Sequence, residues 1–306
     1  MKVAVALGGN ALLKRGEPLT AENQARNIRR AARALGALGK DHDLVVVHGS
    51  GPQVGLLALQ DAAVPEAGNF PLDVLNAQTT GMIGYPVAQA LRNELPERQV
   101  ASILTQIEVD PDDPAFAHPT KPIGPVYTRE EAERLARERH WHVAPDGKGW
   151  RRVVPSPQPK RILEIETIQL LVDAGVLVLA AGGGGIPVVF DALGRAHGVE
   201  AIIDKDPAAA LLAMNIGAQA LLLLTDTPAV QAGWGTPDAR DLFELTVTEA
   251  RELDLPAGSM GPKVRAAAAF VERTGARAGI GCLEDAAAIL EGSAGTRIVP
   301  APVKTG

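Results

Sequence analysis

Short, almost continuously apolar segments alternate with helical patterns along this chain of 306 residues. Strands are expected at residues 2–7, 43–48, 99–106, 176–181, 220–225 and 276–281. Strands that are apolar on both faces are typical of a parallel sheet, because the crossover connections place helices over both of its sides. The chain therefore predicts an α/β fold with an open, mainly parallel sheet and helices on both faces.

Amphipathic segments between the apolar runs predict the covering helices. They are expected at residues 21–38, 52–62, 73–94, 161–174, 206–216, 246–253, 262–274 and 284–291. Thr20 is the expected N-cap of the first helix, since a threonine hydroxyl accepts a hydrogen bond from an amide of the first turn.

Residues 107–160 interrupt this alternation with many prolines and charges. Thr128 and Glu131 have capping-box spacing, which predicts a short exposed helix, and Asp146-Gly147 predicts a hairpin turn. We interpret the region as a small protruding insert. A prior of roughly 150 residues per domain suggests two lobes, and we place their boundary between residues 214 and 215.

Composition excludes several classes of protein. The net charge is −6, and no basic stripe with interleaved aromatics is present, so a nucleic-acid partner is not expected. The longest apolar runs are shorter than the roughly 20 residues that cross a bilayer, so no membrane partner is expected. The single cysteine, Cys282, excludes an internal disulfide framework. No apolar leader pattern follows the first strand, and a cytoplasmic location is expected.

Glycine-rich turns follow three of the expected strands, at residues 8–10, 49–51 and 182–185. Ligands of open parallel sheets bind beyond the carboxyl ends of the strands. Glycine lets backbone amides approach a phosphate closely, and a following helix N-terminus adds partial positive charge. Each turn alone also fits a tight strand-to-helix connection, and neither common nucleotide fingerprint is complete. The three turns together indicate a phosphate site.

Three lysines lie in glycine- or proline-shaped turns, namely Lys121, Lys205 and Lys263. A lysine in such a turn is well placed as a point charge on phosphate, although each also fits a solvated surface position. Asp204 and Asp206 flank Lys205; they could orient it, lie near Mg²⁺, or cap the following helix. This inventory favours phosphoryl transfer, which needs positioning and charge neutralisation rather than a covalent nucleophile.

Several longer segments then identify a family. The chain resembles the carbamate kinases of the amino-acid kinase family along nearly its whole length, in "VALGGNALL", "HGSGPQVG", "GMIGY", "HPTKPIGPVY", "AAGGGGIPVV", "GVEAIIDKD" and "GSMGPKV". The resemblance implies an open α/β sandwich, a homodimer, and reversible Mg²⁺-dependent phosphoryl transfer between ATP and carbamate, with carbamoyl phosphate and ADP on the other side. It also implies a role in arginine breakdown.

The resemblance assigns roles by position. Catalytic roles fall to Lys121, Asp204, Lys205 and Asp206. Acceptor contacts in the lobe of residues 1–214 fall to Gly8, Gly9, Asn10, Gly49, Ser50 and Gly51. Nucleotide contacts are expected at Gly183, Gly184, Thr225, Asp226, Met260, Gly261 and Lys263, with residues 215–306 as the nucleotide lobe. No protein ligand for the metal is assigned, and the insert is expected to act as a lid.

The chain departs from the family pattern at three places. Ser50 stands where the family usually has asparagine, and "QTTGMIGY" replaces "ETQGMIGY", which changes positions 78 and 80. "TDTPAVQ" replaces "TDVDAVY" near the expected nucleotide site. Because the first two lie nearest the acceptor, two alternatives stay open. One is a kinase of the same fold that acts on another small carboxylate, and the other is a catalytically silent nucleotide-binding sensor.

Overall fold

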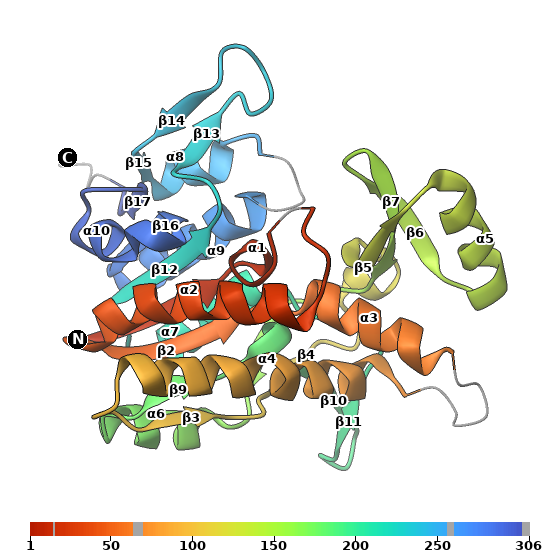
Figure 1. The fold of residues 1–306 in the computed structure, drawn as a ribbon, viewed down its shortest axis with the longest axis horizontal. Helices are drawn as coiled ribbons and strands as arrows, with labels where there is room; N and C mark the ends of the chain where they lie inside the picture. Colours follow the sequence, from red (N-terminus) through yellow and green to blue (C-terminus); the bar gives the residue numbers. More distant parts are fainter. Residues whose placement is uncertain (15, 64–69, 256–259, 302–306) are drawn as a thin grey trace.

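The computed structural model describes residues 1–14, 16–63, 70–255 and 260–301, without the side chains of residues 10 and 11. At its centre is an eight-stranded sheet with the strand order β15-β17-β16-β12-β1-β2-β9-β3 (Figure 1). Its strands are β1 (Lys2–Leu7), β2 (Asp43–His48), β3 (Val100–Ser102), β9 (Leu177–Leu179), β12 (Ala220–Thr225), β15 (Glu244–Thr246), β16 (Arg277–Cys282) and β17 (Thr296–Val299). Neighbouring strands run parallel except β16 and β17, which confirms the predicted fold class.

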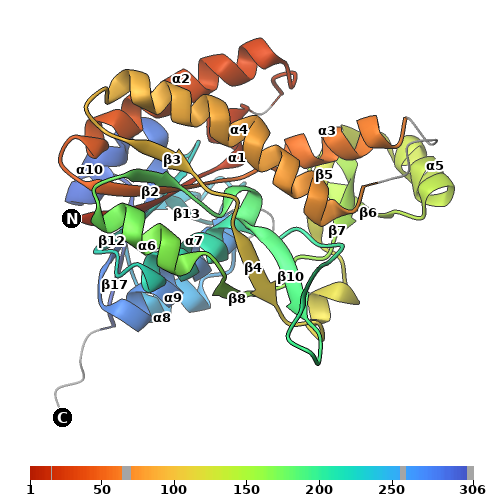
Figure 2. The ribbon, with the colours of Figure 1, turned by 90° about the horizontal axis from the view of Figure 1, so that it is seen from below.

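Helices cover both faces of this sheet, so the molecule has three layers (Figure 2). One face carries α2 (Ala21–Gly39), α4 (Leu72–Glu94) and α10 (Ala286–Glu291). The other carries α6 (Ile165–Asp173), α7 (Lys205–Asn215), α8 (Val247–Glu252) and α9 (Met260–Thr274). Successive residues of β1 enter the two cores in turn: Val3 and Val5 pack on one side, and Ala4 and Ala6 on the other. This is the two-residue period of a strand that is buried on both faces.

The predicted helix caps are present. The Thr20 hydroxyl accepts a hydrogen bond from the Asn23 amide at 3.2 Å, at the start of α2. Thr128 and Glu131 form both bonds of a capping box at the start of α5 (Arg129–Arg139). These bonds satisfy amides that the first turn of a helix leaves without partners.

A second sheet was not predicted, and it corrects two expectations. The expected strand at 99–106 is two strands, because Ile103 bonds to Leu179 in the central sheet while Thr105 accepts from Ile186 in the other. The expected helix at 161–174 begins only at Ile165, because the preceding residues form a strand. The second sheet has the order β11-β10-β4-β8. Its strands are β4 (Gln106–Val109), β8 (Pro159–Ile162), β10 (Ile186–Phe190) and β11 (Ala196–Gly198).

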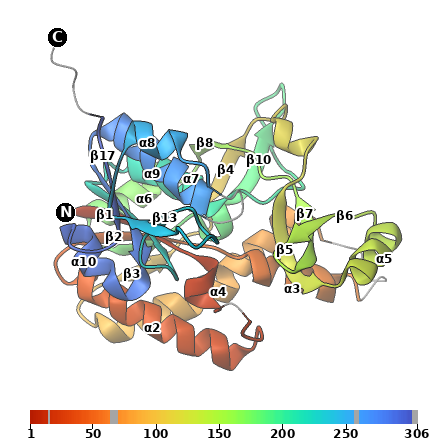
Figure 3. The ribbon, with the colours of Figure 1, turned by 90° about the horizontal axis from the view of Figure 1, so that it is seen from above.

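The predicted insert is therefore shorter than 107–160, since its ends belong to the second sheet. The protruding part comprises β5 (Lys121–Tyr127), α5, β6 (His142–Asp146) and β7 (Gly149–Val154), which stand clear of the sheet at one end of the molecule (Figure 3). Asp146 pairs with Gly149, so the hairpin turn is Gly147-Lys148 and not Asp146-Gly147.

The protrusion is anchored on α3 (Gly51–Asp61) through two glycines. A Cβ atom on Gly55 would lie 1.9 Å from Cα of Gly124, so only glycine allows β5 to approach the helix this closely. The remaining described elements are α1 (Gly9–Leu12), η2 (Pro114–Phe116), η3 (Gly182–Gly184), β13 (Val230–Ala232), β14 (Arg240–Leu242) and η4 (Leu283–Asp285). Within the described ranges, every helix is too short or too polar to cross a bilayer.

Candidate active site

The carboxyl ends of β1 and β2 place two of the glycine turns side by side. These strands are adjacent and pair in register from Lys2 with Asp43 to Leu7 with His48. A Cβ atom on Gly49 would lie 3.5 Å from the backbone nitrogen of Gly9 and 3.2 Å from Cδ of Lys205. The side chain of Lys205 therefore passes beside Gly49, next to the point where the turns at 8–10 and 49–51 meet, although it is more than 150 positions away along the chain.

A buried carboxylate joins two of the predicted lysines. Lys205 Nζ lies 3.2 Å from Oδ1 of Asp206, and Lys263 Nζ lies 3.2 Å from Oδ2 of the same carboxylate. Asp206 is in the first turn of α7 and Lys263 is in the first turn of α9, and these helices pack against each other. The side chains of Asp206, Lys263 and Lys205 are only 2%, 6% and 11% exposed. Packing of the two helices thus gathers these charges beside the glycine turns.

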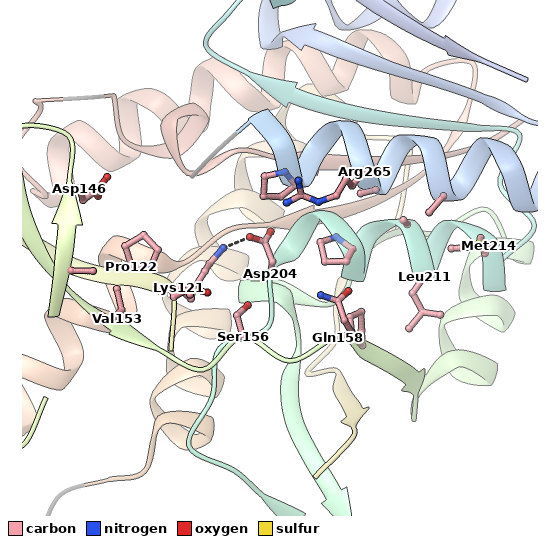
Figure 4. A pocket seen from close by; sticks show the side chains of 18 of the residues that line it. Lys121, Pro122, Asp146, Val153, Ser156, Gln158, Asp204, Leu211, Met214 and Arg265 are labelled. Carbon is pink, nitrogen blue, oxygen red and sulfur yellow. Dashed lines mark hydrogen bonds and ion pairs between the residues drawn. The ribbon is translucent and has the colours of Figure 1, made fainter. Parts of the chain in front are cut away.

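Asp204 caps α7 and also holds Lys121. Its Oδ1 accepts a hydrogen bond from the Asp206 amide at 3.0 Å, and its Oδ2 forms an ion pair with Lys121 on β5 (Figure 4). Of the roles considered for this aspartate, the helix cap is therefore present, whereas its ion pair is with Lys121 and not with Lys205. The ion pair ties the protruding part of the chain to the start of α7.

Burial and charge interactions act together on the ionisation of this cluster. Burial opposes ionisation of Asp204, but Lys121 and Lys205 hold the pKa of its carboxyl well below the ordinary value. Burial also opposes the charge of Lys205, yet Asp206 and Asp204 raise its pKa. For Lys263, burial and then the charge of Lys205 lower the pKa. With all groups charged, three ammonium groups face two carboxylates, which leaves one positive charge for an anion.

The third glycine turn, at 182–185, follows β9 and has an unusual backbone. Ala181 has φ of +49°, and its amide donates to Oγ1 of Thr105 at 2.9 Å. Gly183, Gly184 and Gly185 all have positive φ. A Cβ atom on Gly184 would lie 2.1 Å from the carbonyl oxygen of Ile203, so this position excludes any side chain. A left-handed, buried alanine costs energy, and such strain clusters at ligand sites.

The structure places this turn next to Ser50. A Cβ atom on Gly183 would lie 2.6 Å from Oγ of Ser50 and 2.2 Å from Oδ1 of Asn76. The sheet order explains the placement, because β9 neighbours β2 while β12 lies two strands away from β2. The sequence predicts nucleotide contacts for Gly183 and Gly184. Gly183 lies beside Ser50, whereas Gly184 lies beside the backbone of Ile203 and Asp204. Gly51 lies close to the protrusion, since its Cβ atom would be 3.7 Å from the carbonyl oxygen of Pro122.

The expected nucleotide residues lie at the ends of β12 and α9. Thr225 is buried at the end of β12, and its hydroxyl donates to Oδ1 of Asp226 at 3.2 Å. β12 adjoins the first turn, since the Gly8 amide bonds to the carbonyl oxygen of Leu224 at 2.9 Å. Met260 and Gly261 begin α9. Residues 256–259, which precede this helix in the sequence, and the side chain of Asn10 lie outside the described part of the structure.

Sequence reasoning missed three buried polar residues near the turns. Asn76 on α4 is fully buried and contacts the turn at 182–185, and the Thr105 hydroxyl supports Ala181. His48, at the end of β2, is also buried; burial, opposed by its bond to the Gly49 carbonyl, lowers its pKa to about 4. The available signal was a polar residue at a position where the periodicity expects an apolar one.

A cavity of about 860 Å³ opens beside the cluster, between the protrusion and helices α7 and α9 (Figure 4). Its lining includes Lys121 and Asp204 together with Arg265, Leu211 and Met214. It gives solvent access to the Lys121–Asp204 pair. The glycine turns and Lys205 are not part of its lining.

The geometry is that of a site which neutralises a phosphate. It presents backbone turns and ammonium groups, and its histidine is buried and neutral. No cluster of three or more His, Cys, Asp or Glu residues suited to a metal occurs in the part of the chain that the structure describes.

Comparison with known proteins fits this arrangement. The model of the amino acid kinase family matches residues 1–281. The chain belongs to this family. Within the family, it is 52% identical over 299 residues to a carbamate kinase of Haemophilus influenzae, covering 97% of this chain and 96% of that one. It is 47% identical over 312 residues to a carbamate kinase of Pyrococcus furiosus, with 98% and 99% covered.

A solved member of the amino acid kinase family has the same fold. The structure of carbamate kinase from Giardia lamblia bound to AMP-PNP matches with a TM-score of 0.88 at 39% identity, and the match covers 98% of each chain. The chain is thus a kinase, that is, a phosphotransferase of this family.

Proposed function

We propose that this amino acid kinase family member is a carbamate kinase, which transfers a phosphoryl group reversibly between ATP and carbamate. The observation that carries the proposal is the pair of lysines on one buried carboxylate, with Lys205 beside Gly49 where the turns that follow β1 and β2 meet. The sequence similarity to known carbamate kinases, which supports the proposal, extends over nearly the whole chain. An AMP-PNP complex of one relative supports use of ATP and ADP.

The reaction needs no proton transfer and no covalent enzyme intermediate. Towards ATP, an oxygen of the β-phosphate of ADP attacks the phosphorus of carbamoyl phosphate. The bond between that phosphorus and the carbamoyl oxygen breaks, and its electron pair leaves with carbamate. Catalysis therefore consists of alignment and stabilisation of negative charge on the moving group.

We divide the site residues into those that bind the phosphoryl acceptor and those that bind the nucleotide. We assign the acceptor to residues 1–214, with the turns at 8–10 and 49–51 around the carbamoyl end. We assign the nucleotide to residues 215–306, with Lys263 at its phosphates. Lys205 lies beside Gly49 and shares Asp206 with Lys263, so we assign to it the role of bridging the phosphates. Lys121 approaches from the protrusion, which we propose acts as a lid.

Mg²⁺ enters this proposal with the nucleotide. Asp204 and Asp206 are both paired with lysines, and the described residues hold no carboxylate cluster. We therefore assign no protein ligand to the ion. Mg²⁺ commonly binds through substrate phosphates and retains several waters; when bound it neutralises charge on the phosphate oxygens. The proposed phosphoryl transfer does not require a protein ligand to Mg²⁺.

A homodimer, a cytoplasmic location and a part in arginine breakdown are further proposals that rest on the family resemblance. One feature of α4 supports the dimer: Val74, Met82 and Tyr85 are exposed, the last by 67%. Size-exclusion chromatography with light scattering tests the dimer directly, and a monomer at micromolar concentration would contradict it.

Formation of ATP from carbamoyl phosphate and Mg·ADP by the pure protein tests the proposed function. We expect ATP formation that follows protein concentration, and its absence would overturn the proposal. Because Ser50 departs from the family pattern, acetyl phosphate serves as the competing substrate. A higher kcat/KM with acetyl phosphate would favour the kinase of another small carboxylate, and tight ATP binding without turnover of either substrate would favour a sensor.

A further inference from the structure

Asn76 carries a fully buried carboxamide in the middle of α4. Its Oδ1 accepts a hydrogen bond from Oγ of Ser50 at 3.1 Å, and its Nδ2 donates to the carbonyl oxygen of Gly185 at 2.9 Å. One side chain thus connects a helix on the face of the sheet with two separate strand-end turns. The two turns are otherwise 131 residues apart at their nearest ends, Gly51 and Gly182.

The carboxamide also touches the most sterically restricted point of the third turn. A Cβ atom on Gly183 would lie 2.2 Å from Oδ1 of Asn76, and φ at Gly183 is +68°. Thr80, one turn further along α4, places its hydroxyl 3.5 Å from the carbonyl oxygen of Gly182. Two carbonyl groups of the turn are therefore bound from α4, which fixes the direction of the intervening peptide groups.

A buried asparagine inside a helix is unfavourable on two counts. Its helix propensity is low, and a buried amide costs free energy unless its hydrogen bonds are made. Here both ends of the amide have a partner in a glycine turn at the site, and Oδ1 also accepts from Oγ1 of Thr79 on the same helix at 3.3 Å. Local preference is overridden where a tertiary role requires it.

The carboxamide of Asn76 also fills the space next to the side chain of Ser50. Ser50 is short and buried. Because Asn76 Oδ1 lies within hydrogen-bond distance of Ser50 Oγ, an asparagine at position 50 would bring its amide into the space that the Asn76 amide occupies. The structure therefore has room for one carboxamide at this point, and Asn76 supplies it.

We propose that Asn76 is a positioning residue for the phosphoryl acceptor: from α4 it supplies the carboxamide that aligns Ser50 with the turn at 182–185. The inference rests on the proposed function. Asn76 acts through these two groups and not on the nucleotide, since the hydrogen bonds that its carboxamide makes outside α4 are with residues that follow β2 and β9. Its loss therefore weakens binding of carbamoyl phosphate and leaves binding of ADP nearly unchanged.

The test compares N76A, S50N and the double variant N76A/S50N, with KM measured for carbamoyl phosphate and for ADP. We expect N76A to raise KM for carbamoyl phosphate at least tenfold and KM for ADP less than twofold. S50N alone crowds Asn76 and lowers kcat/KM, whereas N76A/S50N restores KM for carbamoyl phosphate to within threefold of wild type. If Asn76 only stabilised the fold, an asparagine at position 50 would not restore the KM for carbamoyl phosphate in N76A.

Asn27→Ala is the matched control, because Asn27 is a buried helical asparagine on α2 whose amide binds Glu17 at 2.7 Å. We expect it to lower the melting temperature without changing the ratio of the two KM values. If N76A does not fold, N76D, which has the same shape but cannot donate to Gly185, takes its place.

Equal changes of both KM values in N76A, or failure of S50N to restore activity in a folded double variant, would overturn the inference. The wild-type assay separates this outcome from failure of the proposed function. If the wild-type protein forms no ATP from carbamoyl phosphate, the function is wrong. If it does and N76A behaves like wild type, only the role of Asn76 is wrong.

Discussion

Lys205 and Lys263 are held by opposite oxygens of one carboxylate, each ammonium group 3.2 Å from Asp206. The carboxylate is 2% exposed, so both lysines depend on it in an environment where isolated charges are costly. This shared partner allows two positive charges to lie close together before any phosphate is present. It also makes the site a point where catalysis and stability are linked.

Asp206→Asn should therefore destabilise the protein. The substitution keeps the shape but leaves two buried ammonium groups facing each other, and loss of one partner of a buried ion pair costs about 3–5 kcal/mol. We expect a loss of that order in urea unfolding. Removing one ammonium as well, in D206N/K263M, should recover a large part of it. Equal stability of D206N and wild type would show that the shared carboxylate is not needed to hold the lysines.

Lys205→Ala should abolish most turnover. A charge that clamps the transferring phosphate is worth about 10³ or more in rate, so we expect kcat to fall by roughly that factor. Lys40→Ala, an exposed lysine at the end of α2, is the control and should retain wild-type kcat. Turnover by K205A near the wild-type rate would refute the bridging role.

Gly183→Ala should lower the free energy of unfolding more than Gly194→Ala does. Gly194 has a similar positive φ of +74° but no atom within 4 Å of its Cβ position, whereas Gly183 would clash with Asn76 and Ser50. The backbone term of about 1–2 kcal/mol is common to both, and overpacking adds about 1–3 kcal/mol at Gly183 alone. Equilibrium unfolding of G183A and G194A measures the difference. Equal losses would mean that the turn relaxes freely.

His48 should make stability depend on pH between about 4 and 6.5. Its pKa falls from 6.5 to about 4 in the folded state because it is buried. Between these values the unfolded chain binds more protons, so stability rises with pH and is lost as pH falls. From pH 7 to pH 5 this group alone should remove about 2 kcal/mol.

The comparison of wild type with His48→Gln isolates this contribution. Urea unfolding at pH 5 and pH 7 should show a smaller pH-dependent loss in H48Q, by about the amount attributed to His48. An identical pH dependence in the two proteins would exclude His48 as its source.

The local sequence pattern was sufficient to predict most of the helices and strands. The strands at 2–7, 43–48 and 220–225 have the predicted bounds, and Thr20 and Thr128 cap the helices expected of them. Such features depend on periodicity and on hydrogen bonds within a few residues, which a sequence displays directly. The position of the glycine turns at the ends of strands was predictable because each turn directly follows an apolar run in the sequence.

The sequence could not show which strand-end groups face one another. Lys263 meets Asp206 across 57 positions, Lys121 meets Asp204 across 83, and Asn76 meets Gly185 across 109. The division of residues 99–110 between two sheets was likewise invisible, because a continuous β pattern does not say where a strand changes its partner. These contacts arise only when helices and strands pack, since strand order and close packing, and not local preference, decide which distant residues share one buried site.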